Sequence, residues 1–309
     1  MSRIHEALKK AEEQRAGAQP DQAELPSAAD IPPLQATAVE SSTAAVVTAP
    51  AAAPAFGSPF SLDTLLARCK QCSWAPDSKA MLFFNSDEHG YGTEEFRTLR
   101  SRLYQIRNKQ SLKKVLITSA LPKEGKSFVA ANLAQVIVQQ HGRRALLIDA
   151  DLRGPRLHTS LGTPSSPGLA EYLLAEVDEF AIVQRGPMDN LFFIPSGRSV
   201  SSPAELVANG RLKFLLNRVE SLFDWIILDS PPAVPVSDAA LLANYCDGVL
   251  MVVRSNATPF DIAKKARQEF HDKHLVGVVL NGIEPGSSSY NEYYYAAYGK
   301  PNGRGEARG

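Results

Sequence analysis

The sequence has few cysteines, no net charge and no long apolar run, and each of these features narrows its class. Cys69-Lys-Gln-Cys72 has the spacing of half a zinc site, but the only other cysteine is Cys246, so a second pair is missing. We interpret the pair as structural. The 33 basic and 33 acidic side chains give a formal net charge of zero, which gives no reason to expect a nucleic-acid partner.

Segments typical of membrane insertion or secretion are also missing. No stretch reaches the roughly 18 apolar residues of a membrane span, and the charged N-terminus lacks the apolar core of a signal peptide. We therefore expect a cytoplasmic protein with no transmembrane segment of its own. The hydrophobic content of 44% is enough for one sizeable core.

The N-terminal 60 residues divide into two parts. Residues 1–15 predict a short amphipathic helix, because Ile4, Leu8 and Ala11 fall on one stripe. Residues 16–60 contain 14 alanines, 7 prolines and no lysine or arginine. Such a segment has too few large apolar side chains to build a core, so we expect a disordered linker. We expect one globular domain over residues 61–285 and a mobile tail over 286–309.

A candidate phosphate-binding loop lies near the middle of the chain. Ala120-Leu-Pro-Lys-Glu-Gly-Lys-Ser127 follows the apolar run 115–118 and precedes an apolar-periodic stretch, which predicts a strand, a tight loop and a helix. Lys126 can reach the β- and γ-phosphates of a nucleotide, and the Ser127 hydroxyl can bind Mg²⁺. The usual first glycine is replaced by Ala120, so the loop must enter with a less demanding backbone conformation. The expected nucleotide-binding residues are Leu121, Pro122, Lys123, Glu124, Gly125, Lys126, Ser127, Phe128 and Asn281.

Three aspartates follow predicted buried strands. Asp149 and Asp151 are two residues apart, so an extended chain points them to the same side. Asp229 follows the apolar run 225–228. Because ligands of open α/β sheets lie beyond the carboxyl ends of the strands, we expect all three to converge on the phosphate loop. Ser127, Asp149 and Asp229 are the expected metal-binding residues. Asp149 and Asp151 both remain candidates for the general base.

Alternating strands and helices predict the fold class. The order of the segments indicates an α/β protein with a doubly wound, mostly parallel sheet. The predicted strands are 115–119, 145–149, 191–195, 225–229, 248–253 and 276–281. The predicted helices are 93–107, 126–140, 203–218, 238–245 and 259–271.

The C-terminal region concentrates the tyrosines. Five of the nine tyrosines lie within nine residues, flanked by Gly, Pro, Ser and Asn that indicate a mobile terminus. An exposed tyrosine run suggests that something binds or modifies these side chains. The candidate acceptors of a phosphoryl group are Tyr290, Tyr293, Tyr294, Tyr295 and Tyr298.

The combination of these motifs resembles the bacterial tyrosine kinases (BY-kinases) of capsule and exopolysaccharide biosynthesis. The resemblance covers roughly residues 80–299 and rests on the phosphate loop, Asp149-Ala-Asp-Leu-Arg153, Asp229-Ser-Pro-Pro232 and the tyrosine cluster. It implies a P-loop NTPase fold related to partitioning ATPases, with ATP and Mg²⁺ as cofactors. It also implies autophosphorylation of the tyrosine cluster, between subunits, and regulation of polysaccharide polymerisation and export.

The resemblance also implies partners. Glu94, Arg97 and Arg100 on the predicted helix 93–107 match a family pattern that joins subunits into a ring-shaped homo-oligomer. A transmembrane chain-length or co-polymerase protein would activate the kinase and recruit it to the inner face of the plasma membrane. A tyrosine phosphatase would reverse the modification.

Two alternatives remain open from the residues alone. A partitioning or positioning ATPase would switch with nucleotide and modify no protein, but such proteins carry a lysine where this chain has Leu121. An inactive scaffold could bind ATP and recruit partners through its tail.

Overall fold

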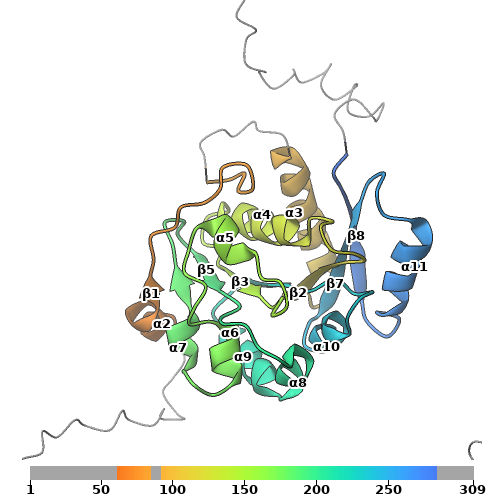
Figure 1. Ribbon diagram of the computed structural model, residues 1–309. Helices are drawn as coiled ribbons and strands as arrows, with labels where there is room; N and C mark the ends of the chain where they lie inside the picture. Colours follow the sequence, from red (N-terminus) through yellow and green to blue (C-terminus); the bar gives the residue numbers. More distant parts are fainter. Residues whose placement is uncertain (1–60, 85–91, 284–309) are drawn as a thin grey trace, which may run out of the picture. The chain divides into compact units, whose positions relative to one another are not determined.

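The computed structural model describes residues 61–84 and 92–283, which form one unit built around a single sheet (Figure 1). The predicted N-terminal helix, the linker and the tyrosine-rich tail lie outside the described residues, as do residues 85–91, 284 and 285 of the predicted domain. Over the part that is described, no helix is both long and apolar enough to cross a bilayer.

The sheet has eight strands in the order β1-β4-β5-β3-β6-β2-β7-β8. All neighbouring strands are parallel except β4 and β5, which are antiparallel. The chain starts the main sheet at β2, winds outward to β5, returns to β6 beside β2, and then continues to β7 and β8, so the sheet is doubly wound. The strands are β1 Lys70–Gln71, β2 Lys114–Ser119, β3 Ala145–Asp149, β4 Gln184–Arg185, β5 Leu191–Ile194, β6 Trp225–Asp229, β7 Gly248–Arg254 and β8 Leu275–Asn281.

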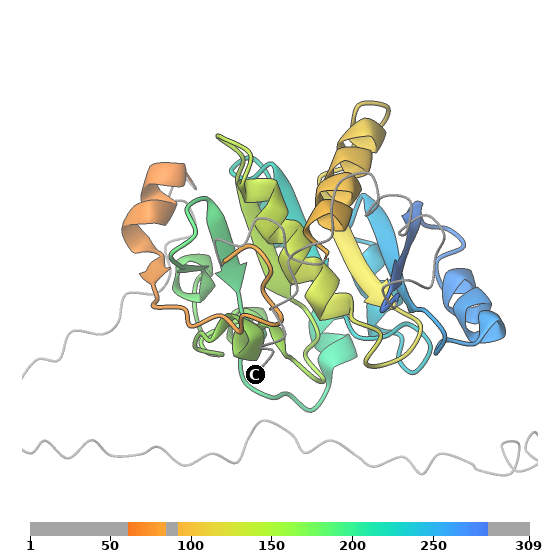
Figure 2. The same ribbon diagram turned by 90° about the horizontal axis from the view of Figure 1, so that it is seen from above.

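Helices cover both faces of the sheet (Figures 1 and 2). One face packs against α3, α4 and α5, and the other packs against the group from α6 to α10. The helices are α2 Leu62–Arg68, α3 Thr93–Arg107, α4 Lys126–Val138, α5 Leu157–Leu161, α6 Leu169–Leu173, α7 Glu179–Ile182, α8 Pro203–Ala208, α9 Arg211–Val219, α10 Asp238–Ala243 and α11 Phe260–Gln268.

Alternation along the central strands produces two cores. In β3, Leu146 and Ile148 join the core under α6–α10, while Ala145 and Leu147 join the core under α3–α5. Every residue of β3 and β6 is buried. A strand buried on both faces is continuously apolar until its last residue, so an acid at its end is placed at the sheet's edge.

The predicted fold class is confirmed, and the six predicted strands all occur within one residue of their expected bounds. The single helix predicted over 203–218 was wrong, because the structure has two helices that meet at Asn209 and Gly210. Gly210 has a φ of 83°, a left-handed conformation that interrupts a right-handed helix. The two-residue strands β1 and β4 were not predicted, since two residues carry no periodic signal.

Candidate active site

The phosphate loop connects β2 to α4 at the carboxyl edge of the sheet. Gly125 precedes the first residue of α4 and has a φ of 99°, and a Cβ there would collide with the Asn281 side chain. Ala120 is fully buried and its φ is not positive, so an alanine fits where other loops have glycine. Lys123 takes the left-handed conformation instead, with a φ of 68°.

Lys126 is the first residue of α4, and its ammonium lies among the three aspartates. Its Nζ donates to Asp151 Oδ2 at 2.9 Å and lies 3.5 Å from the Ser127 Oγ. Burial lowers the pKa of Lys126, but the charges of Asp229, Asp151 and Asp149 outweigh it, so that its pKa is raised. Lys126 is therefore a fixed positive charge at the point where a helix N-terminus also favours anions.

Asp149 and Asp229 lie side by side at the ends of neighbouring strands. They are register partners in β3 and β6, and neither side chain is exposed. The Asp149 carboxylate accepts from the Asp151 amide at 3.3 Å and from the Leu157 amide at 3.2 Å. Burial raises the pKa of Asp149 well above its usual range, and the charges of Asp229 and Asp151 raise it further. The predicted convergence of these acids on the phosphate loop is what the geometry shows.

Asp229 differs from the other two acids because neither of its buried carboxylate oxygens has a hydrogen-bond partner of normal geometry among the described residues. Burial raises its pKa to about 6, while the Lys126 charge and the neighbouring Ser127 hydroxyl oppose this shift. A buried acceptor without a donor fits a cation, or water bound to one. Ser127 and Asp229 together are thus suited to Mg²⁺.

Among the described residues, no group of three or more histidine, cysteine, aspartate or glutamate side chains is arranged to hold a metal ion.

A group of contacts around the loop was not predicted. Glu124 accepts from the Leu121 amide at 2.7 Å and from the Thr258 hydroxyl. Asn281, which we expect to bind nucleotide, donates to the Glu124 carbonyl at 2.9 Å. Arg254 donates to the Lys123 carbonyl at 3.2 Å. The contacts of Thr258, Asn281 and Arg254 join residues that lie more than 130 positions apart, so no local pattern could have indicated them.

Arg153, in the segment after Asp151, has a fixed partner. Its guanidinium donates twice to Asp238 of α10, at 2.8 and 2.9 Å. The Asp151 carboxylate accepts from the Arg153 and Gly154 amides at 3.3 and 3.0 Å. Residues 151–154 are therefore held to α10 by a two-pronged ion pair.

Comparison with known proteins identifies relatives of this chain. The sequence model of the AAA domain matches residues 123–261. The chain is 37% identical over 205 residues to the tyrosine-protein kinase YwqD of Bacillus subtilis. This alignment covers 66% of this chain and 85% of the relative. It is 32% identical over 212 residues to the tyrosine-protein kinase CpsD of Streptococcus agalactiae, with coverage of 67% and 90%. The chain belongs to the bacterial tyrosine-protein kinase family.

Other relatives and solved structures place the chain in the same family. The kinase domain of the Escherichia coli tyrosine kinase ETK has a TM-score of 0.60 and 30% identity, over 63% of this chain and 77% of that chain. The putative tyrosine-protein kinase EpsB of Ralstonia nicotianae is 35% identical over 225 residues. The match covers only 30% of that longer relative.

The expected kinase ring residues lie on α3, and one of them has a role inside the subunit. Arg97 pairs with Glu94 on the same helix. Arg100 Nη1 donates to the Val136 carbonyl at 2.6 Å, in the last turn of α4. Arg100 therefore also satisfies a helix-end carbonyl within its own chain.

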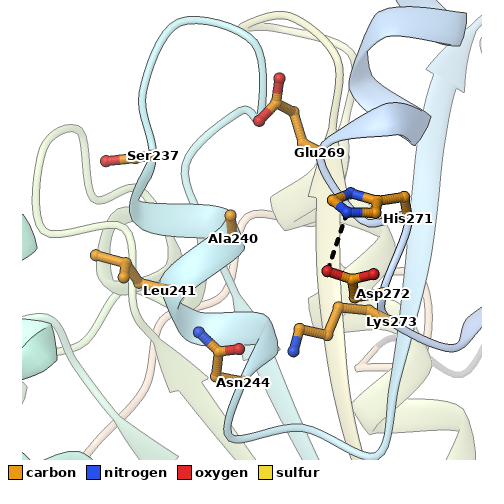
Figure 3. Close-up of a pocket in the computed structure, with 8 residues that line it drawn as sticks. All are labelled: Ser237, Ala240, Leu241, Asn244, Glu269, His271, Asp272 and Lys273. Carbon is orange, nitrogen blue, oxygen red and sulfur yellow. Dashed lines mark ion pairs between the residues drawn. The ribbon is translucent and has the colours of Figure 1, made fainter.

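The remaining predicted groups lie away from the phosphate loop or outside the described chain. The candidate acceptors Tyr290, Tyr293, Tyr294, Tyr295 and Tyr298 fall outside the described residues. Cys72 is buried in the core under α3–α5, and both Cys69 and Cys72 are free thiols. A hollow of about 240 Å³ lies between α10 and the turn from α11 to β8 (Figure 3), and none of its lining residues belongs to the phosphate loop.

Proposed function

We propose that this kinase transfers the γ-phosphoryl group of ATP to its own C-terminal tyrosine cluster. The observation that carries the proposal is the buried Lys126 ammonium at the N-terminus of α4, beside Asp149, Asp151 and Asp229. Phosphoryl transfer depends mainly on positioning and on charge neutralisation, and this site offers both. The acceptors are Tyr290, Tyr293, Tyr294, Tyr295 and Tyr298.

Each loop residue has a distinct role in this proposal. Amides of residues 123–128 hold the phosphates, and Lys126 exchanges Asp151 for the β- and γ-phosphates. Ser127 and Asp229 hold Mg²⁺, with Asp149 acting through water. When bound, Mg²⁺ neutralises charge on the phosphates. The general base is Asp149, whose pKa is raised by burial and by the neighbouring carboxylates, or otherwise Asp151.

Transfer takes place between neighbouring subunits. Tyr290 lies nine positions after Asn281, and an extended chain of that length spans about 30 Å. This reach allows a tyrosine to enter its own site or a neighbour's, and the motif resemblance favours the neighbour. Glu94, Arg97 and Arg100 join the subunits into a ring.

In the cell, the activity of this kinase depends on two further proteins. A transmembrane chain-length partner activates the kinase and recruits it from the cytoplasm to the membrane, and a phosphatase resets it. Through this cycle the kinase regulates exopolysaccharide or capsule polymerisation and export. The support is the match of motifs and tail to the family.

Incubation of the purified chain with MgATP, followed by phosphotyrosine detection and peptide mapping, tests the chemistry. We expect label on the five tail tyrosines and none in Lys126→Met, which loses the charge that contacts the phosphates. Lys213→Met changes an exposed lysine on α9 and should behave as wild type. ATP hydrolysis without phosphotyrosine would instead favour a partitioning-type ATPase, and binding without turnover would favour a scaffold.

Mixing two inactive forms tests transfer between subunits. A variant with all five tail tyrosines changed to Phe keeps the active site, and Lys126→Met keeps the tail. The mixture should label the tail of Lys126→Met. If only wild-type chains label, and the mixture does not, transfer takes place within one chain.

A further inference from the structure

The phosphate loop, which follows β2, is attached by side chains to the end of the neighbouring strand β7 and to the turn after it. Thr258, between β7 and α11, donates to Glu124, and Arg254 at the end of β7 donates to the Lys123 carbonyl. The Thr258 hydroxyl also accepts from the Arg254 amide at 3.1 Å. Thr258 thus connects the end of β7 to the middle of the loop.

Glu124 makes this attachment important for the loop. Its side chain is only 3% exposed, so its carboxylate depends on the donors that the protein supplies. One oxygen accepts from the Leu121 amide, and the other accepts from the Thr258 hydroxyl. The Glu124 carboxylate therefore closes the loop between residues 121 and 124 and attaches it to Thr258.

Lys123 has a second reason to need support. It is a non-glycine residue in the left-handed region, with a φ of 68°. Such a conformation persists only where surrounding contacts hold it. The Arg254 guanidinium binds the carbonyl of this residue, two positions before Gly125 and three before Lys126.

We propose that Thr258 and Arg254 are positioning residues of the nucleotide site, which keep the phosphate loop in its binding conformation through Glu124 and Lys123. The proposal deepens the kinase function and rests on it for its effect on turnover. If either contact is lost, the loop populates other conformations. Apparent affinity then falls in proportion to the fraction of loops that remain competent.

Thr258→Val tests the proposal, because it keeps the shape of the side chain and removes the hydroxyl. Titration with a fluorescent ATP analogue and Mg²⁺ should show an apparent Kd about tenfold above wild type, since a buried acceptor has lost a donor. Thr258→Ser keeps the hydroxyl and should bind within about twofold of wild type. Thr159→Val on α5 is the matched control and should bind as wild type.

Turnover gives a readout that a purely structural role would not move. In Thr258→Val the rate of tail phosphorylation at saturating ATP should also fall, by about tenfold or more, because small misplacements of reacting groups are costly. In a Glu124→Met background, which lacks both acceptor oxygens, adding Thr258→Val should change the Kd little, because the two residues act through one contact. Additive effects would show that Thr258 does not act through Glu124.

Arg254→Met provides a variant that should fold, since this side chain is exposed. We expect an apparent Kd about threefold above wild type, with Arg254→Lys between the two. Wild-type affinity in Thr258→Val, or equal losses in the Val and Ser variants, would overturn the role of Thr258. Wild-type affinity in Arg254→Met would overturn that of Arg254. A changed Kd without phosphotyrosine in wild type would contradict the kinase proposal and leave the loop contacts supported.

Discussion

The charged side chains of the candidate active site differ in whether they have a partner. Lys126 has an ion pair with Asp151, while the Asp229 oxygens have no hydrogen-bond partner of normal geometry in the described part of the chain. Binding of nucleotide with Mg²⁺ would change both, by drawing Lys126 towards phosphate and supplying a cation to Asp229. The carboxylates of Asp151 and Asp229 therefore differ in their environment, because burial and neighbouring groups differ between them.

Asp149→Asn and Asp151→Asn separate the two candidate bases. We expect Asp149→Asn to lose phosphotyrosine formation while still binding nucleotide. Asparagine offers only one carbonyl oxygen to the two amides, but it also removes a buried charge that Asp229 and Asp151 repel, so the two effects oppose each other and the variant should stay folded. Phosphotyrosine rates and denaturant unfolding are the measurements. An active Asp149→Asn beside an inactive Asp151→Asn would assign the base to Asp151.

Helix ends depend on donors from other elements. The last turn of α4 receives the Arg100 guanidinium from α3, and the first turn of α6 contains Glu171, which accepts from the Gly168 and Arg198 amides and from the Ser166 hydroxyl. Both contacts give a hydrogen-bond partner to a backbone group at a helix end, which would otherwise have none within the helix. Arg100→Ala and Glu171→Gln each remove one of these contacts.

Arg97→Ala and Arg100→Ala should have different effects, although both belong to the proposed ring pattern. We expect Arg97→Ala to lower the mass of the assembled kinase in light scattering with little change in thermal stability. Arg100→Ala should also lower the free energy of unfolding, by about 1.5–3 kcal/mol, because a charged donor to a helix carbonyl is lost. An unchanged assembly in both variants would show that this face of α3 is simply solvated.

Glu171 should make stability depend on pH. Burial would raise its pKa, but the hydrogen bonds from Ser166 and the backbone outweigh this and hold the pKa below its usual value of 4.5. The stabilisation is therefore complete above about pH 4.5 and is lost as the pH falls through the folded-state pKa. Glu171→Gln should flatten this part of the profile. Denaturant unfolding between pH 3 and 7 measures it, and parallel profiles would contradict the prediction.

The described unit brings distant segments to one edge of one sheet. The phosphate loop follows β2, Asp149 ends β3 and Asp229 ends β6, and these three strands are neighbours. The last strand, β8, ends at Asn281, whose side chain contacts the loop. The chain therefore leaves the sheet beside the phosphate loop before it reaches the tyrosine tail.

Phosphorylation of the tail should dissociate the oligomer. Residues 282–309 contain three acidic and three basic side chains, so the unmodified tail is formally neutral. Five phosphotyrosines would add about −8 to −10 charges, which Asp149, Asp151, Asp229 and the ATP phosphates would repel. Light scattering of phosphorylated and phosphatase-treated protein measures this, with the five-Phe variant as control. A phosphorylated protein that remains assembled at moderate salt would contradict the prediction.

Local sequence was sufficient to predict the six longer strands, the helices α3, α4, α10 and α11, the phosphate loop and the acids at strand ends. These features follow from short apolar runs that stop at polar residues and from glycine at a helix start. Periodicity did not show the break at Gly210, because one residue's backbone conformation caused it.

Tertiary structure alone decided which side chains complete the site. Sequence spacing places Thr258 and Arg254 far from Glu124 and Lys123, and the order of the strands brings them together. It also decided that Asp151 holds Lys126 while Asp229 is left without a normal hydrogen bond. The reason is physical: a period of two or 3.6 residues is set by the local backbone, whereas partners across a parallel sheet are set by how the whole chain winds.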